Sequence, residues 1–208
     1  MSVNNVTANL GVFFAFVVVF ERFTVEAYKL FIREEDQRKY FIPQQLHFLG
    51  NLINNKPARY LVGLFIVSLV LVSFYVPLIF PVNFQSILFV GLFWGAIGGL
   101  ANSIGGALKD APLEGFAPLK FWRSTVMAGL WGAIFSFFTS HPSLLLLASV
   151  GAERMTIEFY KTFIEGRAHS KLRAARDSKI LFPDWDKKKI RFLILYLLTW
   201  VVFLIALL

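Results

Sequence analysis

The sequence predicts an all-α, polytopic integral membrane protein with about six transmembrane helices and an internal parallel duplication, in which helices 1 and 2 resemble helices 5 and 6. Three observations predict this fold class: an apolar composition, a confined placement of charge, and a motif that occurs twice. Hydrophobic residues occupy 57% of the 208 positions and charged residues only 16%, whereas soluble globular domains carry about 25% charged residues. The chain has no cysteine, which excludes disulfides and thiolate metal sites.

Six apolar segments approach the roughly 20 residues that a helix needs to cross a bilayer. The fourth and fifth share one apolar run that only His141 and Pro142 interrupt, so five spans with one long helix is the alternative. Proline is favoured at the first position of a helix, which favours a new helix starting at Pro142. The predicted spans are 8–31, 58–80, 86–108, 123–140, 142–163 and 190–208.

The charged residues decide between six spans and five. Every Lys, Arg, Asp and Glu lies in the repeated motif or in one of three segments, 33–59, 109–123 and 165–191. Six spans place all three segments on one face, which the positive-inside rule makes cytoplasmic, whereas five spans place the most basic segment outside. We therefore expect a plasma, inner or equivalent membrane, with loops 33–57, 109–122 and 165–189 cytoplasmic and both termini on the opposite side.

A twelve-residue motif occurs twice, as ERFTVEAYKLFI from Glu21 and as ERMTIEFYKTFI from Glu153, with eight identical positions at an offset of 132 residues. The same offset aligns KPARYLVG from Lys56 with KKIRFLIL from Lys188. One gapless offset indicates an internal duplication, and a displacement by an even number of spans makes the two repeats parallel. The chain is predicted as one transmembrane domain, with repeat 1 at about 8–80, a glycine-rich helix pair at 86–140, and repeat 2 at about 142–208.

The motif supplies the candidate binding site, because ionisable residues inside a membrane are tolerated when they pair, face the bundle interior or line water. The alternatives are a self-neutralising cluster of salt bridges that holds two helices together, and a motif shallow enough to reach the interface. We predict supporting roles for Thr24, Thr156, Tyr28 and Tyr160. The predicted ligands for an ion or solute are Glu21, Arg22, Glu26, Lys29, Glu153, Arg154, Glu158, Lys161 and Asn102.

Two further patterns predict local structure. Gly91, Gly95 and Gly99 are spaced for close packing against another helix or an oligomer partner, which is favoured over a broken helix that coordinates an ion. Leu46, Leu49, Leu52 and Ile53 have helical spacing, which predicts a short helix at the membrane interface or against the protein's own cytoplasmic end.

The resulting functional prediction is a small membrane channel or transporter for an ion or small charged solute, working as a homo-oligomer. The alternative is a non-catalytic structural subunit of a larger membrane complex of respiratory or photosynthetic type. Catalysis is not favoured, because no nucleophile, phosphate-binding or metalloprotease motif is visible, and three scattered histidines predict no metal site. The basic segment 165–191 predicts contact with anionic lipid headgroups, and no nucleic-acid-binding module is visible.

Overall fold

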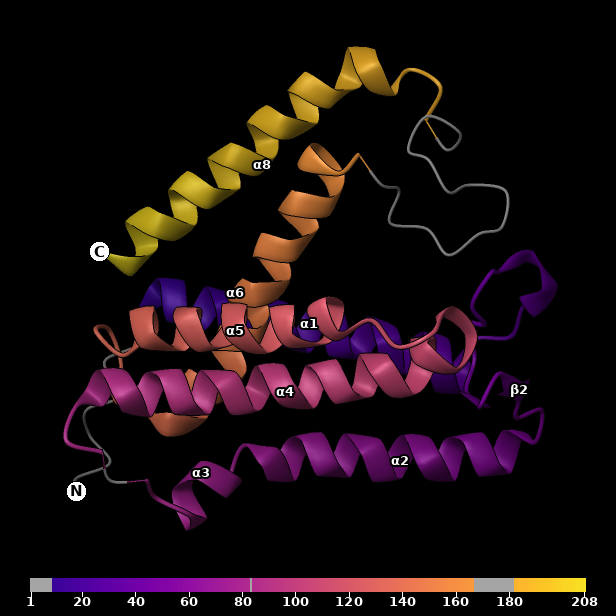
Figure 1. Ribbon diagram of the computed structural model, residues 1–208, viewed down its shortest axis with the longest axis horizontal. Coiled ribbons are helices and arrows are strands. Elements are labelled where there is room, and N and C mark those ends of the chain that lie inside the picture. The colour runs from indigo at the N-terminus through magenta and orange to yellow at the C-terminus, as the bar shows by residue number, and fades with distance from the viewer. Residues whose placement is uncertain (1–8, 83, 167–181) are drawn as a thin grey trace.

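The computed structural model describes residues 9–82, 84–166 and 182–208. These residues are mostly helical, as predicted, and include six long helices. Most of the long helices lie along the molecule, while one crosses the others steeply (Figure 1). A four-residue helix, α3 (Val76–Ile79), follows the second of them. The long helices are α1 (Leu10–Ala27), α2 (Lys56–Ser73), α4 (Ile87–Glu114), α5 (Pro118–Phe135), α6 (Pro142–Phe159) and α8 (Trp185–Leu207).

Short polar residues and prolines set where these helices begin. The Asn9 side chain accepts a hydrogen bond from the Val12 amide at 3.0 Å, and the Ser86 hydroxyl accepts one from the Leu88 amide at 3.3 Å; both satisfy amides that a helix start leaves free. Prolines 118 and 142 stand at the first positions of α5 and α6. The apolar run 124–152 is therefore split between two helices, as the sequence predicted.

Both copies of the motif end in the same irregular way. After α1 the chain continues in a π-helical turn, η2 (Tyr28–Ile32), and after α6 in a second one, η4 (Tyr160–Ile164). The bounds of α1 and α6, and of η2 and η4, are each displaced by 132 residues. π-Helical turns are rare. Their presence at both equivalent positions therefore shows that the two copies of the motif share the same local backbone structure.

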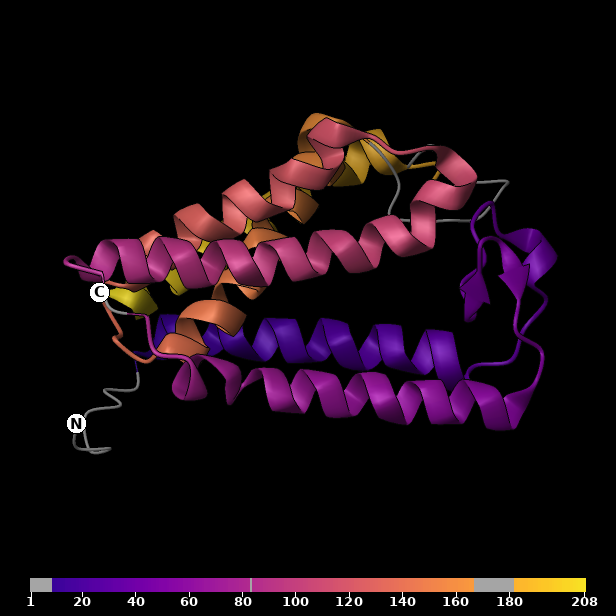
Figure 2. The ribbon, with the colours of Figure 1, turned by 60° about the horizontal axis from the view of Figure 1, so that its bottom comes forward.

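Helix α6 lies at the centre and packs against α1, α4 and α5 (Figures 1 and 2). Its residues from Leu145 to Ala148 are buried, and at Gly151 its backbone meets the carbonyl oxygen of Ala15 in α1 so closely that a Cβ atom has no room. Glycine is thus required where the two motif helices cross, because only a residue without Cβ permits such close backbone approach.

The glycine-rich segment packs within the chain rather than breaking. Helix α4 is continuous from Ile87 to Glu114, so the alternative of a broken helix is wrong. A Cβ atom on Gly91 or Gly95 would overlap the backbone of α5, and one on Gly99 would lie 2.6 Å from the Ser124 carbonyl oxygen. Beyond that point α4 and α5 diverge (Figure 2), and Gly105 and Gly106 have open space around them.

The predicted short helix at 46–53 is also wrong. The segment forms a two-stranded antiparallel hairpin, with β1 (His47–Phe48) pairing with β2 (Asn51–Leu52). The turn residues Leu49 and Gly50 have φ angles of 50° and 85°, and two positive φ angles characterise a tight hairpin turn whose twist matches its strands. The His47 ring then bridges to α4, with Nε2 3.0 Å from the carbonyl oxygen of Lys109.

The ends of the molecule differ in charge. The hairpin and the α4–α5 turn lie at one end, and α8 begins toward that end, whereas the C-terminus and the α3–α4 and α5–α6 connections lie at the other (Figure 1).

By length and composition, α2, α4 and α8 are able to cross a membrane. In each of the helices α1 and α6 the motif places three charged residues.

Candidate functional site

The two copies of the motif occupy different environments. In α6, which is enclosed by three helices, Glu153 is only 1% exposed. Its equivalent in α1, Glu21, lies on an exposed face of the molecule. The two equivalent glutamates, both predicted as ligands, therefore lie in different surroundings, one exposed and one enclosed.

A carboxylate joins the two copies. Glu158 Oε1 lies 3.5 Å from Arg22 Nη2 on α1 and 2.5 Å from Arg154 Nη2, one turn earlier on α6. The contact to Arg22 spans two helices, so it holds α1 against α6 at the level of the motif. This part of the predicted cluster is brought together.

Two further charges of the first copy, Glu26 and Lys29, are paired. Glu26 accepts a hydrogen bond from Lys29 at 3.1 Å through one oxygen and from Lys109 at 3.2 Å through the other. Lys109 belongs to α4, so Glu26 links α1 to the charged end of that helix. In this copy the acidic and basic groups serve contacts between helices.

The second copy lines a pocket between α4, α5 and α6. The pocket has a volume of about 160 Å³ and includes three predicted ligands of α6 and η4, together with Asn102 of α4. It reaches from exposed residues of the α4–α5 turn, such as Gly115, to the buried Glu153. Its charged side chains are Asp110, Lys120, Arg123, Glu153, Arg154 and Lys161.

Two polar atoms at this pocket stay unpaired. Glu153 Oε2 and Arg123 Nε are buried and have no hydrogen-bond partner within the described residues. Buried polar atoms in folded proteins nearly always have a partner, and leaving one unpaired costs about 1–3 kcal/mol. An atom of this kind beside a cavity marks a place where a further group would be stabilised.

The predicted supporting residues do not touch the pocket. The Thr156 hydroxyl donates to the Ala152 carbonyl at 2.9 Å and accepts from Trp131 Nε1 at 2.9 Å, which ties α6 to α5. The Thr24 hydroxyl donates to the Phe20 carbonyl at 2.8 Å within α1. Tyr28 and Tyr160 are exposed. Thr24 thus bonds within its own helix, Thr156 also joins α6 to α5, and the two tyrosines are exposed.

Sequence reasoning missed Asp110 and Lys120 as members of the site because it assigned 109–122 to a loop, and it missed Arg123 at the first position of the predicted span 123–140. Helix α4 instead continues to Glu114 and α5 begins at Pro118, which places Arg123 in a helix facing the pocket. Pro118 carried the signal, since proline is favoured at the first helical position. Lys120 lies 3.1 Å from Glu114 and 3.5 Å from Asp110, at the mouth of the pocket.

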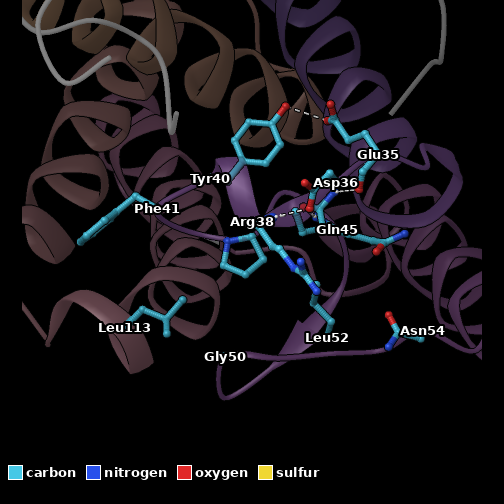
Figure 3. A pocket seen from close by; sticks show the side chains of 12 residues that line it. Glu35, Asp36, Arg38, Tyr40, Phe41, Gln45, Gly50, Leu52, Asn54 and Leu113 are labelled. Atoms are coloured by element: carbon cyan, nitrogen blue, oxygen red, sulfur yellow. Dashed lines mark hydrogen bonds between the residues drawn. The ribbon is translucent and has the colours of Figure 1, made fainter. Parts of the chain in front are cut away.

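A second pocket, of about 460 Å³, lies beside the hairpin and is lined by Glu35, Tyr40, Gln45 and Leu113, among others (Figure 3). Its polar groups bond to each other: the Tyr40 hydroxyl donates to Glu35 at 2.7 Å, and Gln37 Oε1 accepts from the Gln44 amide at 2.8 Å. Burial raises the pKa of Glu35, but hydrogen bonds from Lys39 and Tyr40 outweigh it and leave this pKa below its usual value. The pocket contains no residue of the repeated motif.

The sequence predicts lipid contact for one segment and no metal site. The lipid contact expected for 165–191 falls largely on 167–181, which lie outside the described residues. Among the described residues, no three His, Asp or Glu side chains gather in a group able to hold a metal ion.

Comparison with protein-family models, curated proteins and solved structures gives no match to this chain.

Proposed function

We propose that this chain is a small membrane channel or transporter for an ion or small charged solute, with its binding site in the pocket between α4, α5 and α6. The observation that carries the proposal is a cavity that connects the charged end of the molecule to Glu153, a buried acid near the middle of an enclosed helix. An ionisable residue inside a membrane protein is costly and commonly marks the path of an ion or substrate.

The proposed arrangement in the membrane has six spans. Helix α6 has 18 residues and η4 adds 5, which at roughly 1.5 Å per residue suffices for a hydrocarbon core about 30 Å thick. Pairing of Arg22 and Arg154 with Glu158 lowers the cost of placing their charges there. By the positive-inside rule the charged end is cytoplasmic, and the termini lie on the opposite face.

The duplication belongs to the same proposal. The identical displacement of α1 and η2 relative to α6 and η4 supports two parallel repeats, 8–80 and 142–208, on either side of the central pair 86–140. In this view the two copies have divided their roles. The first contributes pairs that join helices, and the second contributes the site.

The equivalence of the two copies provides a matched test. We expect Glu153→Gln to abolish the flux of the transported ion or solute into proteoliposomes containing the purified protein. Glu21→Gln makes the same chemical change at the equivalent position, which is exposed and outside the pocket, and should leave flux near that of the wild type. Equal loss in both variants, or full flux in Glu153→Gln, would place the site elsewhere.

A structural subunit of a larger membrane complex is the second candidate, and one specific observation favours it. Helices α2 and α8 expose most of their apolar side chains along their length, a surface that suits neighbouring subunits as well as lipid. Mild solubilisation from the native membrane, followed by mass measurement, separates the two. A stoichiometric hetero-complex, with no flux in the isolated chain, would establish the subunit; a homo-oligomer with flux would establish the transporter.

A further inference from the structure

The cations of the pocket differ from their counterparts in the first copy. Lys29 is paired with Glu26 at 3.1 Å, whereas its equivalent, Lys161, lines the pocket and forms no ion pair within the described residues. Arg123, which faces Lys161 from α5, likewise forms none there. Glu153 is the acid near both of these cations, and Glu158 already pairs with Arg154. Two basic side chains therefore share one carboxylate, and the pocket carries a surplus of positive charge.

Glu153 adds a second requirement. It is 1% exposed, and its Oε2 atom lacks a donor within the described chain. A fully ionised ligand would satisfy the cations but repel this carboxylate, because like charges in a site of low polarity oppose each other. A ligand that carries both negative oxygens and a hydroxyl hydrogen would satisfy both, since its O–H group donates to a carboxylate oxygen.

We propose that the pocket binds a small oxyanion that retains a hydrogen, of the hydrogen phosphate type. Arg123 and Lys161 bind its negative oxygens, and Glu153 accepts a hydrogen bond from its hydroxyl group. This identification of the ligand class rests on the proposed function. The cavity of about 160 Å³ has room for a small inorganic ion.

The charged groups around Glu153 come from every neighbouring element. Arg154 is next to it on α6, Lys161 follows on η4, Lys120 and Arg123 lie on α5, and Asp110 lies on α4. On α1, Arg22 is held by Glu158 and Glu26 by Lys29 and Lys109. The surplus is basic on the pocket side, which is why Glu153 selects among anions without excluding them.

The experiment is calorimetric titration of the delipidated protein in neutral detergent at pH 7, with inorganic phosphate and with sulfate as probes. Sulfate has the same shape and carries no hydrogen at this pH. We expect phosphate to bind at least about tenfold more tightly than sulfate, because a site built to hydrogen-bond a group disfavours an analogue that lacks it. Equal binding of the two ions, or binding of neither, would overturn the assignment.

Variants locate the site. Arg123→Gln and Lys161→Gln should each weaken phosphate binding by about tenfold or more, whereas Lys29→Gln, at the equivalent and already paired position, should not. Lys161→Arg keeps the charge and should retain binding, which guards against a loss caused by misfolding. Glu153→Gln replaces the acceptor by a side chain that can donate, so the preference for phosphate over sulfate should disappear. A preference that persists in Glu153→Gln contradicts the role of Glu153.

A phosphate monoester on a lipid carries the same chemistry as the free ion. Competition by short-chain phosphatidic acid, with no competition by phosphatidylcholine, would identify a headgroup as the ligand and overturn the free ion. The flux assay separates the two proposals. Phosphate binding without any flux would refute transport and keep the ligand, whereas a flux of cations without phosphate binding would refute the ligand and keep transport.

Discussion

Glu158 is the residue through which the two copies of the motif touch. Its carboxylate is 3.5 Å from Arg22 on one helix and 2.5 Å from Arg154 on the other. The side chain is about four-fifths buried, so these contacts are partly shielded from water and stronger than those of a surface pair. One acid therefore neutralises part of the charge of two arginines.

Glu158→Gln should destabilise the fold. Glutamine keeps the size but loses the charge, so both arginines lose the carboxylate that holds them, at an expected cost of about 1–3 kcal/mol. The measurement is the thermal unfolding midpoint in detergent. Glu21→Gln is the matched exposed control and should change stability by less than about 0.5 kcal/mol. A midpoint equal to that of the wild type would show that the α1–α6 contact does not depend on this pair.

At this scale the sequence predicted which residue types gather and could not predict their environments. Repetition of Glu, Arg, Glu and Lys identified the candidates, and Asn102, Glu153, Arg154 and Lys161 do share a pocket. The difference between Glu21 and Glu153 is invisible in the motif, because it arises from the helices that enclose α6. Burial depends on how the helices assemble, so two segments of similar sequence do not reveal which of them will be buried.

The α4–α5 hairpin shows how small residues position the site. Gly91 and Gly95 bring the two backbones into contact at one end, while Gly105 and Gly106 face open space near the other. The pocket occupies the region where the helices have diverged. Close packing and the cavity are thus two consequences of the same distribution of glycines.

Two glycine variants on this helix should have opposite effects. Gly95→Ala adds a methyl group where α5 leaves no room, and overpacking of this kind costs about 1–3 kcal/mol. Gly105→Ala adds the same group into open space and should gain roughly 0.5–1 kcal/mol, because alanine favours the helix over glycine. Thermal unfolding of both variants provides the measurement. Destabilisation by both would contradict the asymmetric packing.

At the scale of elements, the sequence predicted helices well and one connection badly. Long apolar runs with proline starts placed α5 and α6, and the glycine spacing correctly favoured close packing. The segment 46–53 has helical leucine spacing but forms a hairpin, because Leu49 and Gly50 adopt positive φ angles that a helix excludes. Leu-Gly is an uncommon pair for such a turn. The sequence therefore carried little indication of a hairpin, and the spacing of the leucines led to the prediction of a helix.

The whole molecule keeps its charged connections apart from its uncharged ones. The absence of cysteine makes this separation measurable, because one introduced cysteine reports one position. Leu49→Cys and Leu119→Cys would place exposed thiols at the charged end, and Phe80→Cys and Ser140→Cys would place them at the other.

With six spans, an impermeant maleimide should label positions 49 and 119 only from the cytoplasmic side of the membrane, and positions 80 and 140 only from the opposite side. Oriented vesicles with and without permeabilisation give the measurement. Labelling of positions 119 and 140 from the same side would rule out α5 as a span. The positive-inside rule alone predicts which end is cytoplasmic. The fold predicts which positions should be labelled from the same side.

At this largest scale the sequence predicted the helical class, the membrane character and the gathering of charge. It could not predict that α6 would become the central helix. That position follows from Gly151, Gly98 and neighbouring small residues, which meet the backbones of their partners at close range. The number of small residues was visible, but the partner that each one meets depends on the packing of distant segments.

The α4–α5 hairpin also has a mechanical consequence. The backbones of α4 and α5 are in contact at the glycine-packed end, so a change in the angle between the helices would mainly move the opposite end. The part of α4 beyond Gly99 extends for fifteen residues to Glu114, or about 22 Å. Tilting this part by about 10° would displace its tip by about 4 Å over that length. A change in angle that leaves the glycine contacts intact would therefore alter the width of the pocket mouth between α4 and α5 by more than the diameter of a water molecule.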